Sequence, residues 1–157
     1  MSNEETTGRI PSQLDAVLSA VSPSIELRRH AFALLRDRMG AVEMEFDDDD
    51  DILFRYQGIH FMASFDRLDT SYMRVIYLPF HVFADEDELL KGLAAIDRVN
   101  RSVKVAKVWT LQGREGIRVA ASLEGWIVRH EDLNERSMGR MIEILFTAVN
   151  EFSASKS

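Results

Sequence analysis

A two-residue alternation of apolar side chains with other side chains dominates the middle of the chain. It runs through residues 52–57, pauses at Gly58 and resumes over residues 59–65. Successive side chains of a strand point to opposite faces of a sheet, so this spacing predicts two strands with a tight bend between them. A third strand-like run follows at residues 71–78, and a weaker one precedes them at residues 42–46. Neighbouring strands with short turns predict an antiparallel meander.

Apolar residues at helical spacing lie on both sides of this meander and predict four helices. A short helix is expected at residues 12–21, and a second one begins after Ser22 and ends at Gly40. The third helix opens at Asp85, which is placed as its N-cap, and the last begins near Asn134. The stripes that lie along one side of the last three helices are, in chain order, Ile25, Arg28, Phe32, Leu35 and Met39; Leu89, Leu93 and Ile96; and Met138, Met141, Ile142, Leu145, Val149 and Phe152.

Two more strand patterns separate the last two helices. They cover residues 103–111 and 115–123, with residues 112–114 as the turn of a hairpin. After the short first helix, the predicted order is helix, three strands, helix, two strands, helix. Runs of strands kept apart from helices are typical of α+β domains, in which helices gather on one face of an antiparallel sheet. The sequence therefore predicts an α+β fold.

Composition supports a single globular domain. The chain has 157 residues, of which 46% are hydrophobic and 29% charged, and this size and balance suit one core. The domain is expected to cover residues 12–152, between polar tails at residues 1–11 and 153–157. Cysteine is absent from the sequence, which excludes disulfides and cysteine-based sites. A polar start and the lack of any run near ~20 apolar residues predict a cytoplasmic protein without membrane contact.

Five consecutive aspartates, Asp47 to Asp51, stand between two strand-like stretches. In a calcium loop of the helix-loop-helix kind, Asp47, Asp49 and Asp51 would be ligands. Ile52 would then replace the required glycine, and Gly58 would replace the required glutamate. The flanking segments are strands instead of helices, and clustered carboxylates repel one another. The sequence therefore predicts a solvated turn and no metal site.

The net charge of −7 opposes nucleic-acid binding, because that binding depends on Lys and Arg that neutralise phosphates. One segment is nevertheless basic, with Glu115 as the single acidic residue among six cations. The cations are Arg98, Arg101, Lys104, Lys107, Arg114 and Arg118. Two interpretations stay open. The favoured one is an edge hairpin whose charges oppose pairing with other strands; the other is an anion-facing patch that holds single-stranded nucleic acid with the help of Trp109.

Motifs that carry catalysis are missing from the sequence. The four histidines, His30, His60, His81 and His130, fall in different predicted elements. There is no G-x-S-x-G and no complete glycine-rich nucleotide motif. The sequence therefore predicts no catalytic, cofactor-binding or metal-binding residues, and an enzyme with an unrecognised pocket is kept only as an alternative.

The third predicted strand carries apolar side chains on both of its faces. Tyr72, Ile76 and Leu78 share one face, and Met73, Val75 and Tyr77 share the other. A sheet with one solvated face would alternate more cleanly, so the second face is expected to be covered by the middle helix, by a second copy or by a client polypeptide. Met73, Val75 and Tyr77 are the candidate dimer or partner surface. The alternation leaves open whether they or their alternates face the helices.

Three stretches, taken with this order of elements, resemble the YbjN-domain family. They are FRYQGIHFMASFD at residues 54–66, YMRVIYLPF at residues 72–80 and LLKGLAAIDRVNRSVKVAKVW at residues 89–109. The likeness covers roughly Ile25 to Phe152. Its carriers are Phe54 with Gly58, Asn100 closing the middle helix, and Lys104 with Lys107. A left-handed backbone at the helix end would suit Asn100.

The YbjN-domain family shares its helix-strand-strand-strand-helix-strand-strand-helix fold with the type III secretion chaperones, including the Tir chaperone group. The resemblance implies a small dimeric binding protein without known catalysis, and no cofactor is expected. Together with the two apolar sheet faces, it predicts a non-enzymatic module that forms a homodimer and binds another protein. The alternatives are a regulatory or nucleic-acid-associated protein that uses the basic segment at residues 98–118, and an unrecognised enzyme.

Overall fold

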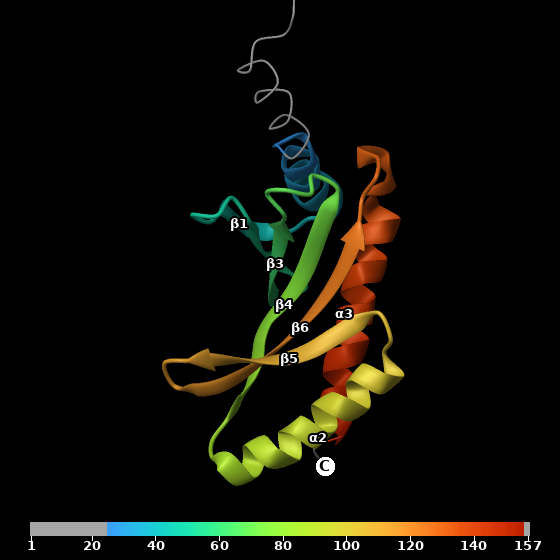
Figure 1. Cartoon of the computed structure of the whole chain (residues 1–157). Coiled ribbons are helices and arrows are strands. Elements are labelled where there is room, and N and C mark those ends of the chain that lie inside the picture. The colour runs from blue at the N-terminus through green and yellow to red at the C-terminus, as the bar shows by residue number, and fades with distance from the viewer. Residues whose placement is uncertain (1–24, 156–157) are drawn as a thin grey trace, which may run out of the picture.

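The computed structural model describes residues 25–155, which form a six-stranded antiparallel sheet with three helices (Figure 1). The strand order is β1-β2-β3-β4-β6-β5. The strands are β1 (Val42–Phe46), β2 (Ile52–Tyr56), β3 (Ile59–Phe65), β4 (Tyr72–Phe83), β5 (Ala106–Gly113) and β6 (Gly116–Trp126). The helices are an N-terminal helix over residues 25–33, α2 (Glu86–Ser102) and α3 (Glu135–Ser155), with a π-helical turn η1 (Leu34–Arg38) and a 3-10 turn η2 (His130–Asp132).

The predicted α+β class and antiparallel sheet are confirmed, with differences in the order of elements. The weak strand pattern at residues 42–46 is a full strand, β1, so four strands precede α2 instead of three. The short helix expected at residues 12–21 lies outside the described residues. At the other end, α3 runs to Ser155, and three residues expected in a polar tail are therefore helical.

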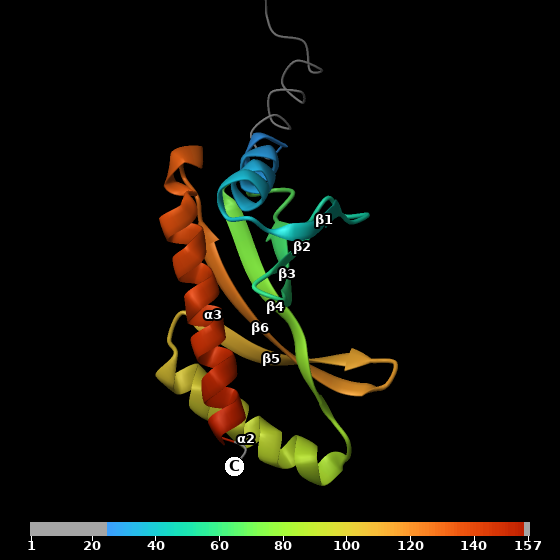
Figure 2. The ribbon, with the colours of Figure 1, turned by 180° about the vertical axis from the view of Figure 1, so that it is seen from behind.

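The N-terminal helix and α3 lie on the face of the sheet that is turned toward the viewer in Figure 2, whereas α2 crosses the end of α3 and lies beside β5. The register puts Phe61 opposite Tyr77 and Ala63 opposite Val75 on this face. α3 lies along it and contributes the predicted stripe, of which every member is buried: Met138, Met141, Ile142, Leu145, Val149 and Phe152. Aromatic rings lock the contact, because Phe146 of α3 meets Phe61 and Tyr77 edge to face, with ring centroids 6.0 and 5.8 Å apart.

α2 keeps two members of the predicted stripe, because Ile96 is buried and Leu89 packs partly buried against the core, whereas Leu93 is 43% exposed. Its other buried residues are Gly92, Ala95 and Val99. A Cβ atom on Gly92 would lie 2.0 Å from the Phe83 ring, so only glycine permits this approach. The helix begins as predicted, since Asp85 accepts a hydrogen bond from the Glu88 N–H at 2.8 Å.

The N-terminal helix keeps part of the expected stripe, because Leu35 is buried and Phe32 and Met39 pack partly buried against the core. Leu27, Ala31 and Leu34 are also buried, while Ile25 is 37% exposed. The helix widens to a π turn at its end, where the Met39 N–H bonds the Leu34 carbonyl at 3.1 Å. Gly40, with a φ of 72°, ends it as predicted.

Two strand boundaries differ from the expectation because of local irregularities. β4 does not stop before Pro79 but continues to Phe83, with a shift of register between Tyr77 and His81. Such an irregularity accommodates a proline, which has no N–H to donate to the ladder. The β5–β6 hairpin is present, but its turn is Arg114–Glu115, because Gly113 pairs with Gly116.

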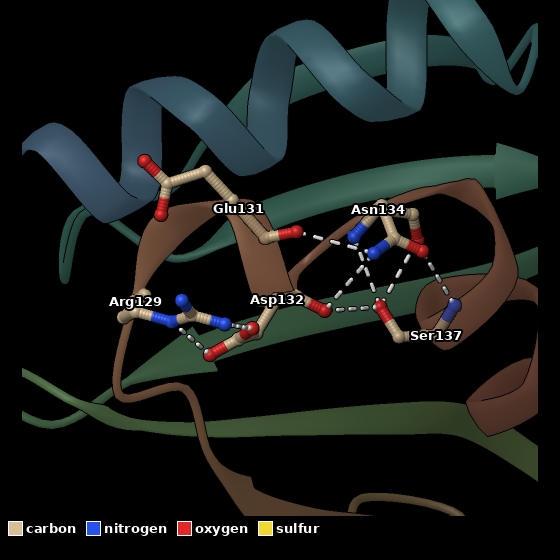
Figure 3. Close-up of polar contacts among 5 residues, drawn as sticks. All are labelled: Arg129, Glu131, Asp132, Asn134 and Ser137. Atoms are coloured by element: carbon tan, nitrogen blue, oxygen red, sulfur yellow. Dashed lines mark hydrogen bonds and ion pairs between the residues drawn. The ribbon is translucent and has the colours of Figure 1, made fainter.

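A closed set of hydrogen bonds starts α3 (Figure 3). The Asn134 side chain accepts from the N–H groups of Arg136 and Ser137 at 3.1 and 3.2 Å, and the Ser137 hydroxyl accepts from the Asn134 N–H at 2.9 Å. Ser137 Oγ also donates to the Asp132 carbonyl at 2.8 Å. These bonds satisfy N–H groups that a helix start leaves free, so Asn134 caps the helix that the sequence predicts to begin near this residue.

The two faces of β3 should respond differently to a new charge. Ala63 is fully buried under the helices, and its neighbour Ser64 lies on the opposite face beside Arg74. We expect Ala63→Asp to destabilise the domain by about 3–5 kcal/mol, because the carboxylate is buried without a partner. Ser64→Asp is the matched control and should change the free energy of unfolding by less than about 1 kcal/mol. Urea denaturation measures both, and equal losses would contradict this assignment of faces.

Candidate functional site

The aspartate run is a hydrogen-bonded turn between β1 and β2. Asp47 Oδ1 accepts from the N–H groups of Asp49 and Asp51, both at 2.9 Å. The Asp47 N–H bonds the Asp51 carbonyl, and the Asp50 N–H bonds the Asp47 carbonyl, both at 3.0 Å. Asp50 has a φ of 62°, a conformation that aspartate tolerates better than most residues. The prediction of a turn is therefore confirmed.

The other aspartates of the run point to different partners. Asp51 is buried, and its Oδ1 accepts from the Phe65 N–H at 3.0 Å, so it ties the turn to the end of β3. Asp49 pairs with Arg67 at 2.9 Å in the β3–β4 turn. Within residues 25–155, no group of three or more acidic, histidine or cysteine side chains is arranged to hold a metal ion.

The six basic residues of the 98–118 segment fall into separate places. Arg98 and Arg101 lie on α2, and Lys104 follows in the loop to β5, whereas Arg114 is at the tip of the β5–β6 hairpin. The eight residues of β5 separate these two groups by about 25 Å. Two cations have acidic partners, since Arg101 pairs with Asp97 at 2.8 Å and Arg118 with Glu115 at 3.5 Å. Lys107 is the second residue of β5, and the hairpin is at the edge of the sheet, as the favoured interpretation predicted.

Asn100 has a role that the sequence did not reveal. It is not in a left-handed conformation at the helix end, since α2 continues to Ser102 and Asn100 has no positive φ. Its side-chain Nδ2 donates to the Val108 carbonyl at 2.9 Å, and its Oδ1 accepts from the Val108 N–H at 2.8 Å. The amide therefore pairs with the outer edge of β5 as the backbone of another strand would.

This contact closes part of a free sheet edge. β5 is an edge strand, and residues of such a strand alternately direct their N–H and C=O groups inward and outward. Val108 directs both groups outward, to Asn100. Thr110 and Gln112 follow Val108 at intervals of two residues, so their N–H and C=O groups also point outward. Asn100 does not reach these groups. Asn100 thus blocks strand addition on the half of β5 nearest the end of α2.

The structure resolves which residues of β4 face the helices. Met73, Val75 and Tyr77 are buried in the core at 0%, 0% and 8% exposure, and burial raises the pKa of the Tyr77 hydroxyl. They are therefore not available as a surface of this chain, and the expectation that they form a dimer or partner surface is corrected. Their alternates Tyr72, Ile76 and Leu78 lie on the other face. The alternation could not decide this because both sets are apolar.

The face opposite the helices carries a row of apolar residues across the sheet. Register places Leu53 opposite Met62, Met62 opposite Ile76, and Ile76 opposite Ser122. At the end of the row, Trp109 of β5 donates from Nε1 to Ser122 Oγ at 3.1 Å, so its indole lies on the same face as the row. We call the apolar residues of this face the open-face band: Leu53, Met62, Ile76, Leu78 and Trp109.

The open-face band is partly desolvated although no described helix covers it. Ile76 and Ser122 are each only 3% exposed, while Leu53, Met62, Leu78 and Trp109 are half-buried. α2, the middle helix, packs against α3, β5 and β4 at the lower end of the molecule instead. Of the three covers that the sequence proposes for the second face, the middle helix is therefore excluded.

Histidines far apart in the sequence meet at the start of α3. The rings of His30 and His130 are stacked with centroids 6.3 Å apart. His30 Nε2 lies 2.6 Å from the Leu133 carbonyl oxygen; a carbonyl only accepts, so this nitrogen donates. The sequence separation of 100 residues hid this pair. His81 lies 3.1 Å from Glu88, and both arrangements hold elements together.

The aspartate turn should depend on one carboxylate. Asp47→Ala removes the acceptor of two N–H groups, and we expect it to lower the free energy of unfolding by about 1–2 kcal/mol. The double variant Asp48→Asn/Asp50→Asn is the control and should stay within about 0.5 kcal/mol, because Asn tolerates the positive φ at position 50. A calcium-dependent rise in melting temperature that the double variant loses would contradict the turn assignment.

The edge contact of Asn100 should contribute measurably to stability. Asn100→Ala leaves the Val108 N–H and C=O without their partner, and we expect a loss of about 1–3 kcal/mol. Asn100→Asp should not restore it, because a carboxylate accepts from the N–H but cannot donate to the carbonyl. Asn150→Ala, at an exposed position of α3, is the matched control. Equal unfolding free energies for the two alanine variants would show that the edge contact contributes nothing.

Comparisons with known proteins add no family assignment. The chain has no match among family models, curated proteins or solved structures. No helix among the described residues combines the length and apolar character needed to cross a membrane. A function for this chain therefore has to be argued from the geometry of the sheet and its open face.

Proposed function

We propose that the chain is a non-enzymatic protein-binding module of the YbjN-like, type III secretion chaperone-like kind, which forms a homodimer and binds another polypeptide. The observation that carries this proposal is the open-face band. It places apolar side chains of four strands on a sheet face that no described helix covers. Half-buried apolar side chains gathered on one side of a sheet favour contact with a protein surface.

The chemistry around the open-face band supports a protein contact. Its centre is apolar and aromatic, and its borders carry the charged side chains of Arg55, Arg74, Glu124 and Lys107. An apolar centre within a polar rim is the usual anatomy of protein interfaces, and tryptophan is enriched among the residues that contribute most to binding. Met62 adds an adaptable side chain.

The element order supports the family part of the proposal. After β1, the described chain follows the sequence of three strands, helix, two strands and helix that the resemblance implies. Two carriers of the resemblance hold this architecture in place. Gly58 adopts a φ of 80° in the turn between β2 and β3, and Asn100 joins α2 to β5.

The homodimer part of the proposal places a second copy on the open-face band. A twofold contact is isologous, so each band would meet the same band of its partner. Each chain has a net charge of −7, which opposes self-association, and the attraction therefore has to come from apolar burial. The cytoplasm, where such a module meets newly made polypeptides, is the location that fits the proposal.

A charge within the open-face band should weaken the dimer without unfolding the chain. We expect Met62→Asp to raise the dimer dissociation constant roughly 100-fold, because a twofold interface buries the new charge twice. Thr147→Asp, on the exposed side of α3, is the matched control and should leave the constant unchanged. Sedimentation velocity over a dilution series, with circular dichroism to check folding, measures both. Unmodified protein that sediments as a monomer at micromolar concentration would refute the dimer.

A further inference from the structure

Large apolar side chains are exposed at the end of the sheet where β3 turns into β4 (Figure 1). Leu68 in that turn is 97% exposed, and Trp126 at the end of β6 is 66% exposed. Tyr72 is paired with Trp126 across β4 and β6, and their rings meet edge to face with centroids 5.7 Å apart. We call Leu68, Tyr72 and Trp126 the end patch. Large apolar side chains that gather at one place on a surface mark an interaction site.

Hydrogen bonds hold the end patch in its exposed position. Trp126 Nε1 donates to Asp69 Oδ2 at 3.0 Å, and Asp69 Oδ1 accepts from the N–H and the hydroxyl of Ser71. The Tyr72 N–H bonds the Asp69 carbonyl at 3.1 Å. A surface whose groups are already fixed loses little conformational entropy when a partner binds. The end patch is therefore preorganised for a contact.

Two hollows adjoin Leu68 and give the end patch the shape of a docking surface. One hollow, of about 560 Å³, reaches from Leu68 to Tyr72 and Arg74. The other, of about 500 Å³, extends from Leu68 to Asp49 in the aspartate turn. Phe65 lines both hollows, so they meet at the end of β3. The space on both sides of the exposed leucine is large enough to receive side chains of a partner.

The charge around the end patch decides which partner chemistry fits it. Carboxylates outnumber guanidinium groups in the lining of the two hollows: Asp49, Asp51, Asp66 and Asp69 against Arg67 and Arg74. Both arginines already have acidic neighbours, since Arg67 pairs with Asp49 at 2.9 Å and Arg74 lies 3.9 Å from Glu124. Within residues 25–155, Asp66 and Asp69 accept hydrogen bonds but have no basic partner.

Both of these carboxylates are ionised at neutral pH. Hydrogen bonds from the N–H groups of Asp69 and Leu68 lower the pKa of Asp66. The hydroxyl and the N–H of Ser71 lower the pKa of Asp69. A twofold contact between two copies would bring these carboxylates together, and nucleic acid or anionic lipid would be repelled by them. Lys and Arg side chains complement them.

We propose that the end patch docks a basic, apolar segment of another polypeptide. An aliphatic or aromatic side chain of that segment packs against the end patch, and a Lys or Arg beside it faces Asp66 and Asp69. The apolar contact supplies most of the affinity, while the charges accelerate association and select the partner. The inference rests on the proposed function and deepens it. The homodimer occupies the open-face band, so the bound polypeptide needs a surface of its own.

A library of random peptides displayed on phage tests the proposal with the full chain. We expect selection on the unmodified protein to enrich peptides in which Lys or Arg stands beside Leu, Ile, Phe or Met. Leu68→Ser/Trp126→Ser should weaken the binding of a selected peptide at least roughly tenfold, because the apolar contact is lost. Leu90→Ser/Leu93→Ser removes exposed leucines of α2 and is the matched control that should bind unchanged. Fluorescence anisotropy of the labelled peptide measures each affinity, and circular dichroism checks folding.

A separate variant tests the charge. Asp66→Asn keeps a side-chain oxygen that can accept from the N–H groups of Leu68 and Asp69, but it removes the negative charge. We expect it to weaken binding of the selected peptide roughly threefold at low salt, and less as salt rises, because exposed charges are screened. Asp87→Asn, in the exposed first turn of α2, is the matched control. Equal affinities for the two variants would contradict a basic partner.

Three results would overturn the proposal. The first is enrichment of acidic or uncharged peptides. The second is a selected peptide that binds Leu68→Ser/Trp126→Ser as tightly as the unmodified protein. If that peptide loses affinity on Met62→Asp, the open-face band binds it, so the protein-binding function stands while the end patch fails. The third is the enrichment of no peptide, which would refute the end patch and the proposed binding of another polypeptide together, whereas sedimentation tests the homodimer separately.

Discussion

The packing of α3 across one face of the sheet is the constraint on which the rest of the structure depends. Phe146 and Phe152 of α3 meet Phe61, Tyr77 and Phe80 in edge-to-face contacts, with ring centroids 5.2–6.0 Å apart among this group. Side chains of a strand alternate strictly between faces. Once α3 desolvates one set, the alternate set of each strand is committed to the opposite face. The open-face band is therefore a consequence of how the core is built.

The position of α2 links the core to the edge of the sheet. Because Gly92 lets the helix approach the Phe83 ring, the last turns of α2 lie beside β5, and Asn100 reaches Val108. A larger side chain at position 92 would move the helix away and open that edge. The close approach of α2 at Gly92 therefore sets both the core packing and the protection of the β5 edge. It also leaves Leu90 and Leu93 on the exposed side of the helix.

Local patterns predicted the strands, the helix cap at Asp85, the start of the last helix near Asn134, and the aspartate turn, because each depends on residues close in sequence. Predictions failed where a distant partner decides. α2 has apolar residues on more than one side. Its contact with the Phe83 ring decides that the side with Gly92 is buried and the side with Leu93 is exposed. Both faces of β4 are apolar, so the sequence could not show which set of its side chains faces the helices. Asn is a residue type common at helix ends, so the sequence placed Asn100 at the end of the middle helix. Its side chain instead bonds the backbone of the next strand.

The state of the edges determines what kind of partner the sheet can accept. At β1, the register is interrupted between Val42 and Glu45, and Glu43 pairs with Arg55; bulges and charges of this kind oppose strand addition. At the other edge, Asn100 occupies the outward groups of Val108. A partner therefore meets an irregular, charged edge at β1 and occupied hydrogen-bonding groups at Val108 of β5, but meets apolar side chains over the middle of the open face. Binding through side chains laid across the strands is favoured over binding through backbone pairing, and specificity would then come from the shape around Trp109 and Ile76.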